Sequence, residues 1–230
     1  MLTLTEPTGR ITKKGLILLA IKNIIFDMDG TLTATAQATE LAIRELTDMF
    51  QLPLITTDDI KGAMGLGGLE FHAKLFPDKT MDQLVAICDR LDKLEQENVK
   101  RIGRDILFPG VAAMFARLVE KGYPIFIAST GSVAHVDTTL RATGIKDLFT
   151  AIHCDEPQKK DMVRRIMDGG DPTQWMMVGD MFKDAEAARA NGIFALGAGY
   201  GYLHEANTHL FDAVIHTPGD IFAFLQEAQS

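Results

Sequence analysis

Cysteine is scarce in this chain: Cys88 and Cys154 are the only two in 230 residues. Two distant cysteines do not make the framework of a disulfide-stapled secreted fold, so we expect a reducing, cytoplasmic location. Positive charge is also in deficit, because 23 Lys and Arg face 31 Asp and Glu and the formal net charge is -8. No global positive field exists to attract nucleic acid or an anionic membrane. A small anionic ligand would need a local cationic residue.

Long hydrophobic runs and several familiar motifs are missing as well. The apolar run at 15–21 follows Lys13 and Lys14 as in a signal peptide, but it is too short to span a membrane and lacks a small-residue cleavage site. We interpret residues 1–21 as an N-terminal extension. The sequence has no Gly-x-x-x-x-Gly-Lys loop, no Gly-x-Ser-x-Gly elbow and no cysteine pair at zinc spacing. Its histidines are scattered, and only His135 lies near a predicted site loop.

Short apolar runs typical of buried strands alternate with helical patterns. The five runs are 24–26, 125–128, 176–178, 193–196 and 213–215. A helix between them is predicted to bury one face made of Val111, Ala112, Phe115, Leu118 and Val119. This alternation predicts a doubly wound, Rossmann-like α/β core with a parallel sheet, formed by residues 1–32 and 108–230. Ligands are expected beyond the carboxyl ends of its strands.

The intervening segment, 33–107, has helical periodicity and almost no strand signal, which predicts an inserted helical cap domain. One apolar stripe contains Ala38, Ala42, Leu46 and Met49, and another contains Met81, Leu84, Val85, Cys88, Leu91 and Leu94. The glycine-rich segment 64–68 is predicted to be either a flexible loop that closes over the site or a turn between cap helices.

The strongest chemical signal is Asp27-x-Asp29-Gly30-Thr31 after the first strand. In an extended backbone, residues two apart point the same way, so both carboxylates can face one ligand. Asp27 can attack phosphorus as an ionised nucleophile, while Asp29 can exchange a proton with the leaving group and then with water. We expect Asp29 to hold a proton because the Asp27 charge is close. Gly30 permits a tight turn and close approach of phosphate, and we expect Gly30 and Thr31 to bind phosphate.

A second acidic pair, Asp180 and Asp184, follows the strand at 176–178. Carboxylates at strand ends attract hard cations, so the four candidate ligands of a Mg²⁺ ion are Asp27, Asp29, Asp180 and Asp184. Asp184 has an alternative interpretation as a helix N-cap.

Two further segments can bind phosphate. Ser129, Thr130 and Gly131 follow the strand at 125–128 and offer a hydroxyl and backbone amides, although a Ser or Thr there is more often a helix cap. Lys159 and Lys160 precede a helix, where one lysine can neutralise a transferring phosphoryl group. The alternative for the lysines is a solvated pair.

Taken together, these motifs resemble the haloacid dehalogenase-like hydrolases, in the phosphoglycolate phosphatase and β-phosphoglucomutase branch with a helical cap. The resemblance extends from about Lys22 onward. It implies that Asp27 is the nucleophile, Asp29 the general acid/base, Ser129 the phosphate-binding hydroxyl and Asp180 a magnesium ligand, with Asp184 as an accessory acid. The family lysine falls within residues 158–161, where Lys159 is favoured and Lys160 is the alternative.

The expected function is magnesium-dependent hydrolysis of a small phosphate monoester, phosphoglycolate-like or a sugar phosphate, through an aspartyl-phosphate. The resemblance implies that Thr31 favours a phosphatase over the alternative, a β-phosphoglucomutase-like phosphomutase. An alternative of another class is a non-catalytic protein that binds a phosphorylated ligand. The partner is a small phosphorylated metabolite, and the chain is expected to be a monomer or homodimer.

Overall fold

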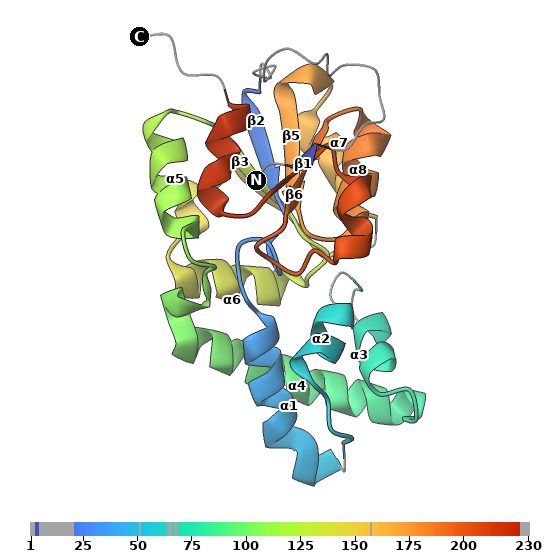
Figure 1. Cartoon of the computed structure of the whole chain (residues 1–230). Helices are drawn as coiled ribbons and strands as arrows, with labels where there is room; N and C mark the ends of the chain where they lie inside the picture. The colour runs from blue at the N-terminus through green and yellow to red at the C-terminus, as the bar shows by residue number, and fades with distance from the viewer. Residues whose placement is uncertain are drawn as a thin grey trace.

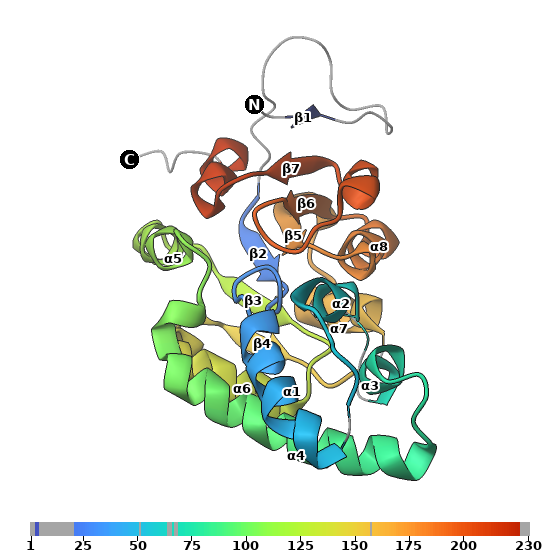
Figure 2. The same ribbon diagram turned by 60° about the horizontal axis from the view of Figure 1, so that its bottom comes forward.

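The computed structural model describes residues 3–4, 21–50, 52–63, 66, 69–156 and 158–225. Its centre is a sheet of six parallel strands in the order β7-β6-β5-β2-β3-β4 (Figures 1 and 2). The strands are β2 (Asn23–Phe26), β3 (Ile125–Ala128), β4 (Ala151–His153), β5 (Trp175–Gly179), β6 (Phe194–Ala198) and β7 (Ala213–Ile215). A two-residue strand, β1 (Thr3–Leu4), pairs antiparallel with β7. The predicted α/β fold with a parallel sheet is confirmed.

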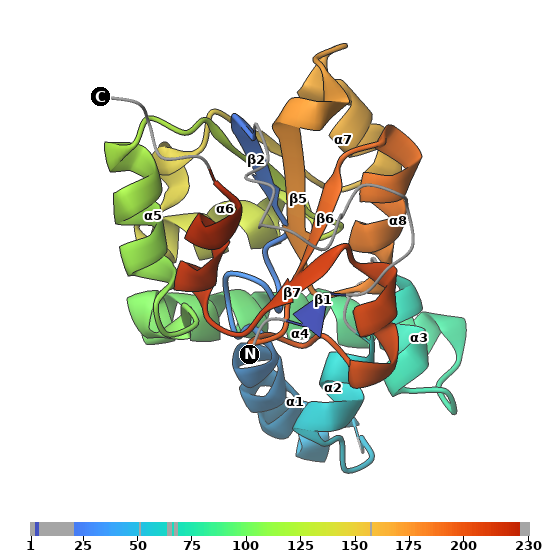
Figure 3. The same cartoon turned by 45° about the horizontal axis from the view of Figure 1, so that its top comes forward.

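Helices cover both faces of this sheet (Figure 3). The helices α5 (Val111–Glu120) and α6 (Val133–Thr143) pack on one face with Ile24 and Phe26, and α7 (Lys159–Met167) and α8 (Phe182–Asn191) pack on the other with Ile25. Successive strand residues point to opposite faces, so a strand with helices on both sides must be apolar throughout. The fully buried β3 and β5 meet that requirement, as does β2 from Ile24 to Phe26.

The strand order places the site at the switch point of the chain. From β2 the chain moves outward through β3 to β4, and then β5 returns to the opposite side of β2. The carboxyl ends of β2, β3 and β5 therefore lie side by side, where an open α/β sheet binds its ligands. The residues that follow these ends are Asp27, Ser129 and Asp180.

A helical insertion lies at this end of the sheet (Figures 1 and 2). It contains α1 (Ala36–Phe50), α2 (Thr57–Ala63), α3 (Leu69–Leu75) and α4 (Met81–Ile102), and has a hydrophobic cluster of its own. The two connections to the core meet at a bridge between Thr33 and Leu107. Short 3₁₀ helices complete the described chain at 103–106, 146–148, 172–174, 205–210 and 218–224. No described helix is long and apolar enough to cross a membrane.

Several local predictions were wrong. Strand β4 was missed because it is short and only half-buried. Val119 is exposed, and Met114 takes its place on the buried face of α5. On α4, Met81 and Val85 are exposed whereas Ile87 is buried, because the true stripe follows the spacing 84, 87, 91 and 94. The stripe of α1 is buried at Ala38, Ala42 and Leu46, and the side chain of Met49 lies outside the described residues.

Candidate active site

Three carboxylates meet beyond the carboxyl ends of β2 and β5. Asp27 directly follows β2, and its backbone N–H donates to the carbonyl of Val178 on β5 at 2.9 Å. Asp180 follows β5, and Asp184 lies in the first turn of α8. Each side chain offers an oxygen within 4.8 Å of the other two, and all three are buried. The switch point therefore concentrates negative charge in a small volume.

One cation lies inside this acidic cluster. The Nζ atom of Lys159 donates to Asp27 at 2.7 Å and to Asp184 at 2.6 Å. Lys159 is only 4% exposed, because it begins α7 beneath the strand ends. Lys160 is half-exposed, and its backbone carbonyl accepts from the side-chain amide of Asn191. Of the two predicted lysines, Lys159 thus contacts the predicted nucleophile.

Asp184 serves the local fold and the cluster together. Its Oδ2 atom accepts from the backbone N–H groups of Asp180 and Met181, at 3.1 and 2.9 Å. These groups lie at the start of α8, where backbone donors lack helical partners. Its Oδ1 atom accepts from Lys159. The two interpretations of Asp184, helix capping and a site residue, are compatible.

The cluster holds more negative charge than Lys159 neutralises. Burial and the nearby Asp184 raise the pKa of Asp27 to about 7, although Lys159 opposes the shift. Burial, Asp27 and Asp184 raise the pKa of Asp180 well above its ordinary range. Carboxyl groups with such shifts are stabilised as anions by a bound cation.

The donor set around Asp180 fits a hard divalent cation. Asp180 Oδ1 accepts from the Thr31 hydroxyl at 2.7 Å, whereas Oδ2 is buried without a hydrogen-bond partner in the described part of the chain. An all-carboxylate set suits Mg²⁺. Gly30 has a φ of +86°, and a Cβ there would lie 2.3 Å from Asp180 Oδ2. Glycine at this position is thus required by both the turn and the approach of Asp180.

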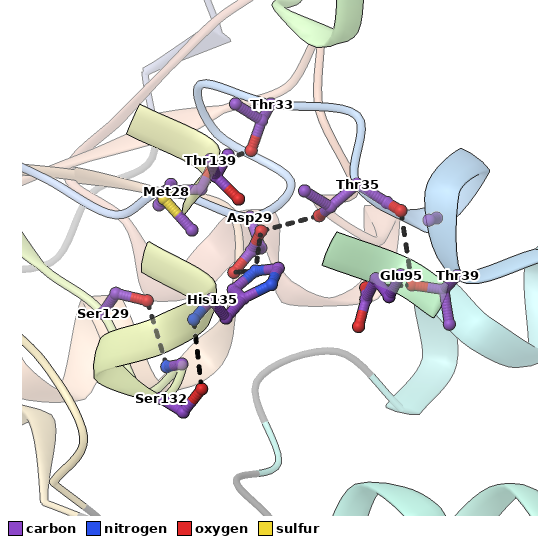
Figure 4. A network of polar contacts seen from close by, with 12 residues as sticks. Met28, Asp29, Thr33, Thr35, Thr39, Glu95, Ser129, Ser132, His135 and Thr139 are labelled. Atoms are coloured by element: carbon purple, nitrogen blue, oxygen red, sulfur yellow. Dashed lines mark hydrogen bonds and ion pairs between the residues drawn. The ribbon is translucent and has the colours of Figure 1, made fainter. Parts of the chain in front are cut away.

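Asp29 belongs to a different network (Figure 4). Its carboxylate accepts from the Thr35 hydroxyl at 2.7 Å and lies 3.0 and 3.1 Å from His135 Nε2. The hydroxyl of Thr39 donates to Glu95 on α4 and to the Thr35 carbonyl. The network thus joins the acid/base candidate to the cap. Asp29 does not share the carboxylate cluster of the other three predicted metal ligands.

The expected protonation of Asp29 is not what this network favours. Burial alone would raise its pKa, but the charge and hydrogen bond of His135, with the Thr35 hydroxyl, lower the pKa below its ordinary value. Burial alone would lower the pKa of His135, but Asp29 raises it to about 10. The pair is therefore an ion pair in this arrangement, with Asp29 as the carboxylate, and the proximity of Asp27 does not decide its state.

The predicted phosphate-binding residues divide into two groups. Ser129, Thr130 and Gly131 line a cavity of about 130 Å³ together with Asp27 and Asp29. The Ser129 hydroxyl accepts from the Gly131 N–H at 3.1 Å, and Ser132 is the residue that caps α6. Thr31 belongs to the second group, whose members do not line the cavity. It is fully buried, and its hydroxyl donates to the carboxylate of Asp180.

The opposite wall of this cavity comes from the cap. It is formed by Leu66, Phe71, His72, Asp92, Glu95 and Gln96. The described residues that line the cavity include no Lys or Arg. Of the predicted loop at 64–68 only Leu66 is described. The prediction that this loop closes over the site therefore concerns residues outside the described part of the chain.

Sequence reasoning missed the residues that surround Asp29. His135 was noted only as lying near a loop, and Thr35 and Glu95 were not recognised as site residues. The sequence contained a signal for His135, because serine is a typical N-cap residue and Ser132 lies three positions before it. In the structure, the Ser132 hydroxyl accepts the His135 backbone N–H at 3.2 Å. A helix that begins at Ser132 places His135 in its first turn, next to the strand ends.

Known proteins resemble this chain in sequence and in fold. A family model described as haloacid dehalogenase-like hydrolase matches residues 24–198. A phosphoglycolate phosphatase of Mesorhizobium japonicum is 27% identical over 190 residues, covering 78% of this chain and 83% of the relative.

Solved structures give the same fold. A predicted phosphoglycolate phosphatase from Haemophilus somnus superposes with a TM-score of 0.80 at 23% identity, covering 90% of this chain and 99% of the other. CbbY of Rhodobacter sphaeroides, in complex with xylulose-1,5-bisphosphate, gives a TM-score of 0.74 at 19% identity, covering 90% of this chain and all of CbbY.

Proposed function

The chain belongs to the haloacid dehalogenase-like hydrolases, and we propose that it is a magnesium-dependent phosphatase that hydrolyses a small phosphate monoester through an aspartyl-phosphate on Asp27. One observation carries this proposal. The buried Asp27 contacts Lys159 and has two further carboxylates within 4.8 Å, while it also lines the cavity. A carboxylate nucleophile needs charged groups around it and must also be accessible to the substrate.

In the first step, a carboxylate oxygen of Asp27 attacks phosphorus, and the bond from phosphorus to the leaving oxygen breaks. The leaving oxygen receives a proton through Asp29, which draws it from the protonated His135 of the ion pair. In the second step, Asp29 takes a proton from a water molecule that attacks the same phosphorus, and Asp27 is released with inorganic phosphate. Lys159 offsets charge on the phosphoryl group and keeps Asp27 in place.

His135 and Thr35 are positioning residues in this scheme. Their contacts hold the carboxylate of Asp29 at the cavity, in the form that accepts a proton from water. The hydroxyl of Ser129 and the backbone at Thr130 and Gly131 supply donors for the remaining phosphoryl oxygens. Each of these residues lines the cavity.

The metal proposal follows from the donor set. Asp27, Asp180 and Asp184 would hold Mg²⁺, which when bound neutralises phosphoryl oxygens and the repulsion among the carboxylates. Support comes from the unpartnered Oδ2 atom of Asp180 and from the raised pKa of Asp27 and Asp180.

The cap wall favours a hydroxyl-bearing leaving group over a carboxylate. Glu95, Asp92 and Gln96 lie on this wall, which has no Lys or Arg among its described residues to pair with a phosphoglycolate carboxylate. The cap loop at 64–68 also carries no charged residue. Like charges repel across a partly buried cavity, whereas sugar or polyol hydroxyls can donate to carboxylates. We therefore place sugar and polyol phosphates ahead of phosphoglycolate.

The test is phosphate release from a panel of phosphate esters, with Mg²⁺ or after its removal by a chelator. We expect turnover that is lost with the metal and restored by adding it back. Release of free phosphate separates hydrolysis from phosphomutase activity, in which the product retains the group. An absence of release from every ester, including a reactive aryl phosphate, would reject the phosphatase. Transfer of the group within a sugar phosphate would then identify a phosphomutase, and absence of transfer as well would favour a non-catalytic binding protein.

A further inference from the structure

A second cluster of potential metal ligands lies in the cap, between α3 and α4, which run side by side (Figure 2). Its members are His72 on α3, and Cys88 and Asp92 one turn apart on α4. The Cys88 Sγ atom lies 3.8 Å from Asp92 Oδ2, and His72 Nε2 lies 3.7 Å from Asp92 Oδ1. All three donor atoms fall within 4.8 Å of one another.

These distances are close to those of a metal shell. With Zn–N and Zn–O bonds of about 2.0 Å and a Zn–S bond of about 2.3 Å, neighbouring donors in a tetrahedron lie roughly 3.3 to 3.5 Å apart. The two measured pairs, which use different oxygens of Asp92, exceed these values by a few tenths of an ångström, and one donor atom from each residue lies within 4.8 Å of the others. Helix α4 fixes the i, i+4 relation of Cys88 and Asp92, and packing against α3 supplies His72.

The donor atoms differ in kind from those of the active site. Nitrogen, sulfur and oxygen donors together suit Zn²⁺ and related transition ions, whereas Mg²⁺ prefers oxygen alone. The acidic set of Asp27, Asp180 and Asp184 is all oxygen. The chain therefore contains one cluster whose donors suit a hard cation such as Mg²⁺ and another whose donors suit a softer cation such as Zn²⁺.

We propose that His72, Cys88 and Asp92 form a binding site for a Zn²⁺-class transition ion in the cap. Binding breaks the S–H bond of Cys88, forms a metal–sulfur bond and releases one proton to solvent; the imidazole of His72 and the carboxylate of Asp92 coordinate without further proton loss. Three protein ligands leave one position of a tetrahedral shell for water or another ligand.

An ion bound by this cluster would lie beside the proposed active site. His72 and Asp92 line the same cavity as Asp27 and Asp29, from the cap side. The ion would join α3 to α4 and reduce the negative charge of the cap wall. Burial and the neighbouring Asp92 and Asp89 raise the pKa of Cys88 to about 12, so the thiol keeps its proton until a cation displaces it.

The experiment uses the full chain, stripped of metals and held in excess Mg²⁺ so that the oxygen site is occupied. Co²⁺ is titrated in, and the near-ultraviolet absorption of a thiolate–cobalt bond is followed. We expect one equivalent of Co²⁺ to produce this absorption and Zn²⁺ to abolish it by competition. Cys88→Ser should remove the absorption and weaken Co²⁺ binding at least about tenfold, because a ligand is lost. His72→Gln should also weaken binding.

Cys154→Ser is the matched control, because Cys154 is the other free cysteine, packs against a hydrophobic cluster of the sheet core and is not part of the ligand cluster. It should leave absorption and affinity unchanged. The proposal is overturned if no thiolate absorption develops, if it depends on Cys154, or if Cys88→Ser binds Co²⁺ with unchanged affinity. Should Cys88→Ser fail to fold, Asp92→Asn takes its place with the same expectation for affinity. Activity is not measured, so the result is independent of the phosphatase proposal.

Discussion

The core wall and the cap wall of the cavity hold their polar groups differently. On the core wall, Asp27 lines the cavity, and ion pairs of 2.7 and 2.6 Å link it through the buried Lys159 to the buried Asp184 behind this wall. On the cap wall, Asp92 and Glu95 lie half-exposed on the single helix α4. A buried, mutually bonded set fixes the geometry that chemistry requires, whereas a half-exposed set on a separate layer can change without disturbing it. Chemistry and selectivity are thus assigned to different layers.

The hydrophobic clusters support the same division. The sheet is packed by two clusters, which meet its opposite faces, and the cap has a third cluster built from residues such as Leu46, Ile60 and Leu91. The polar chain from Asp29 through Thr35 and Thr39 to Glu95 crosses between these layers (Figure 4). Four substitutions test the comparison, in decreasing order of expected effect.

The largest effect is expected from Asp27→Asn on the core wall. The amide keeps the shape of the side chain but is a poor nucleophile, so kcat should fall on the order of 10⁴-fold or more. Phosphate release under saturating ester and Mg²⁺ measures the loss, and circular dichroism verifies folding. Magnesium-dependent release at more than a few per cent of the wild-type rate would remove Asp27 from the nucleophile role.

Lys159→Met and Lys160→Met form a matched pair for the next effect. Lys159→Met removes the cation from a buried acidic cluster, so kcat should fall about 10²- to 10³-fold. Its free energy of unfolding without Mg²⁺ should fall by about 3 kcal/mol, because buried carboxylates lose their partner. Lys160→Met should remain within about twofold of wild type in activity, since Lys160 is half-exposed. Steady-state kinetics and urea unfolding measure both; equal losses in the two variants would contradict the assignment of Lys159.

His135→Gln should have an intermediate effect. Glutamine can donate one hydrogen bond to Asp29 but cannot supply the charge, so kcat should fall about 10- to 100-fold with KM changed much less. His135→Ala should fall further, because the hydrogen bond is lost as well. The exposed His209 provides the control, and His209→Gln should be silent. A change confined to KM would mean that His135 binds substrate instead of positioning Asp29.

The core wall could be predicted from the sequence because its acidic residues directly follow the ends of buried strands. A buried apolar run followed by Asp27 or Asp180 places the side chain at one edge of a parallel sheet, whatever packs around it. The roles of these residues remain predictions, but their convergence could be anticipated. Asp184 shows the limit, since the pattern alone could not separate a helix cap from a site residue, and the structure gives it both contacts.

The cap wall could not be predicted in the same way. Helical periodicity shows that α4 has a buried stripe, but Met81 and Val85 were included in it and Ile87 was not. The stripe depends on how α4 meets α1 and α3, which is a tertiary property. The cluster of His72, Cys88 and Asp92 was missed for this reason, because its ligands come from two helices and show no metal-binding spacing in sequence.

The smallest effect is expected from Glu95→Gln on the cap wall, and it concerns selectivity. Two esters of similar size, 2-hydroxyethyl phosphate and phosphoglycolate, differ in whether the leaving group carries a carboxylate. The wild type should prefer the hydroxyl ester in kcat/KM. Removing one negative charge from a partly exposed wall is worth about 1 kcal/mol, so the variant should gain roughly fivefold in relative kcat/KM for phosphoglycolate.

Lys93→Gln changes the charge of an exposed residue two positions away on α4 and should leave that ratio unaltered. If Glu95→Gln leaves the ratio unaltered too, the cap wall does not read the charge of the leaving group in this way. If wild type prefers phosphoglycolate, a cation outside the described cavity lining must meet its carboxylate, and the selectivity assigned to Glu95 fails while hydrolysis by the core wall stands. Either result would locate the selective contact, because the core wall presents both esters with the same phosphoryl group.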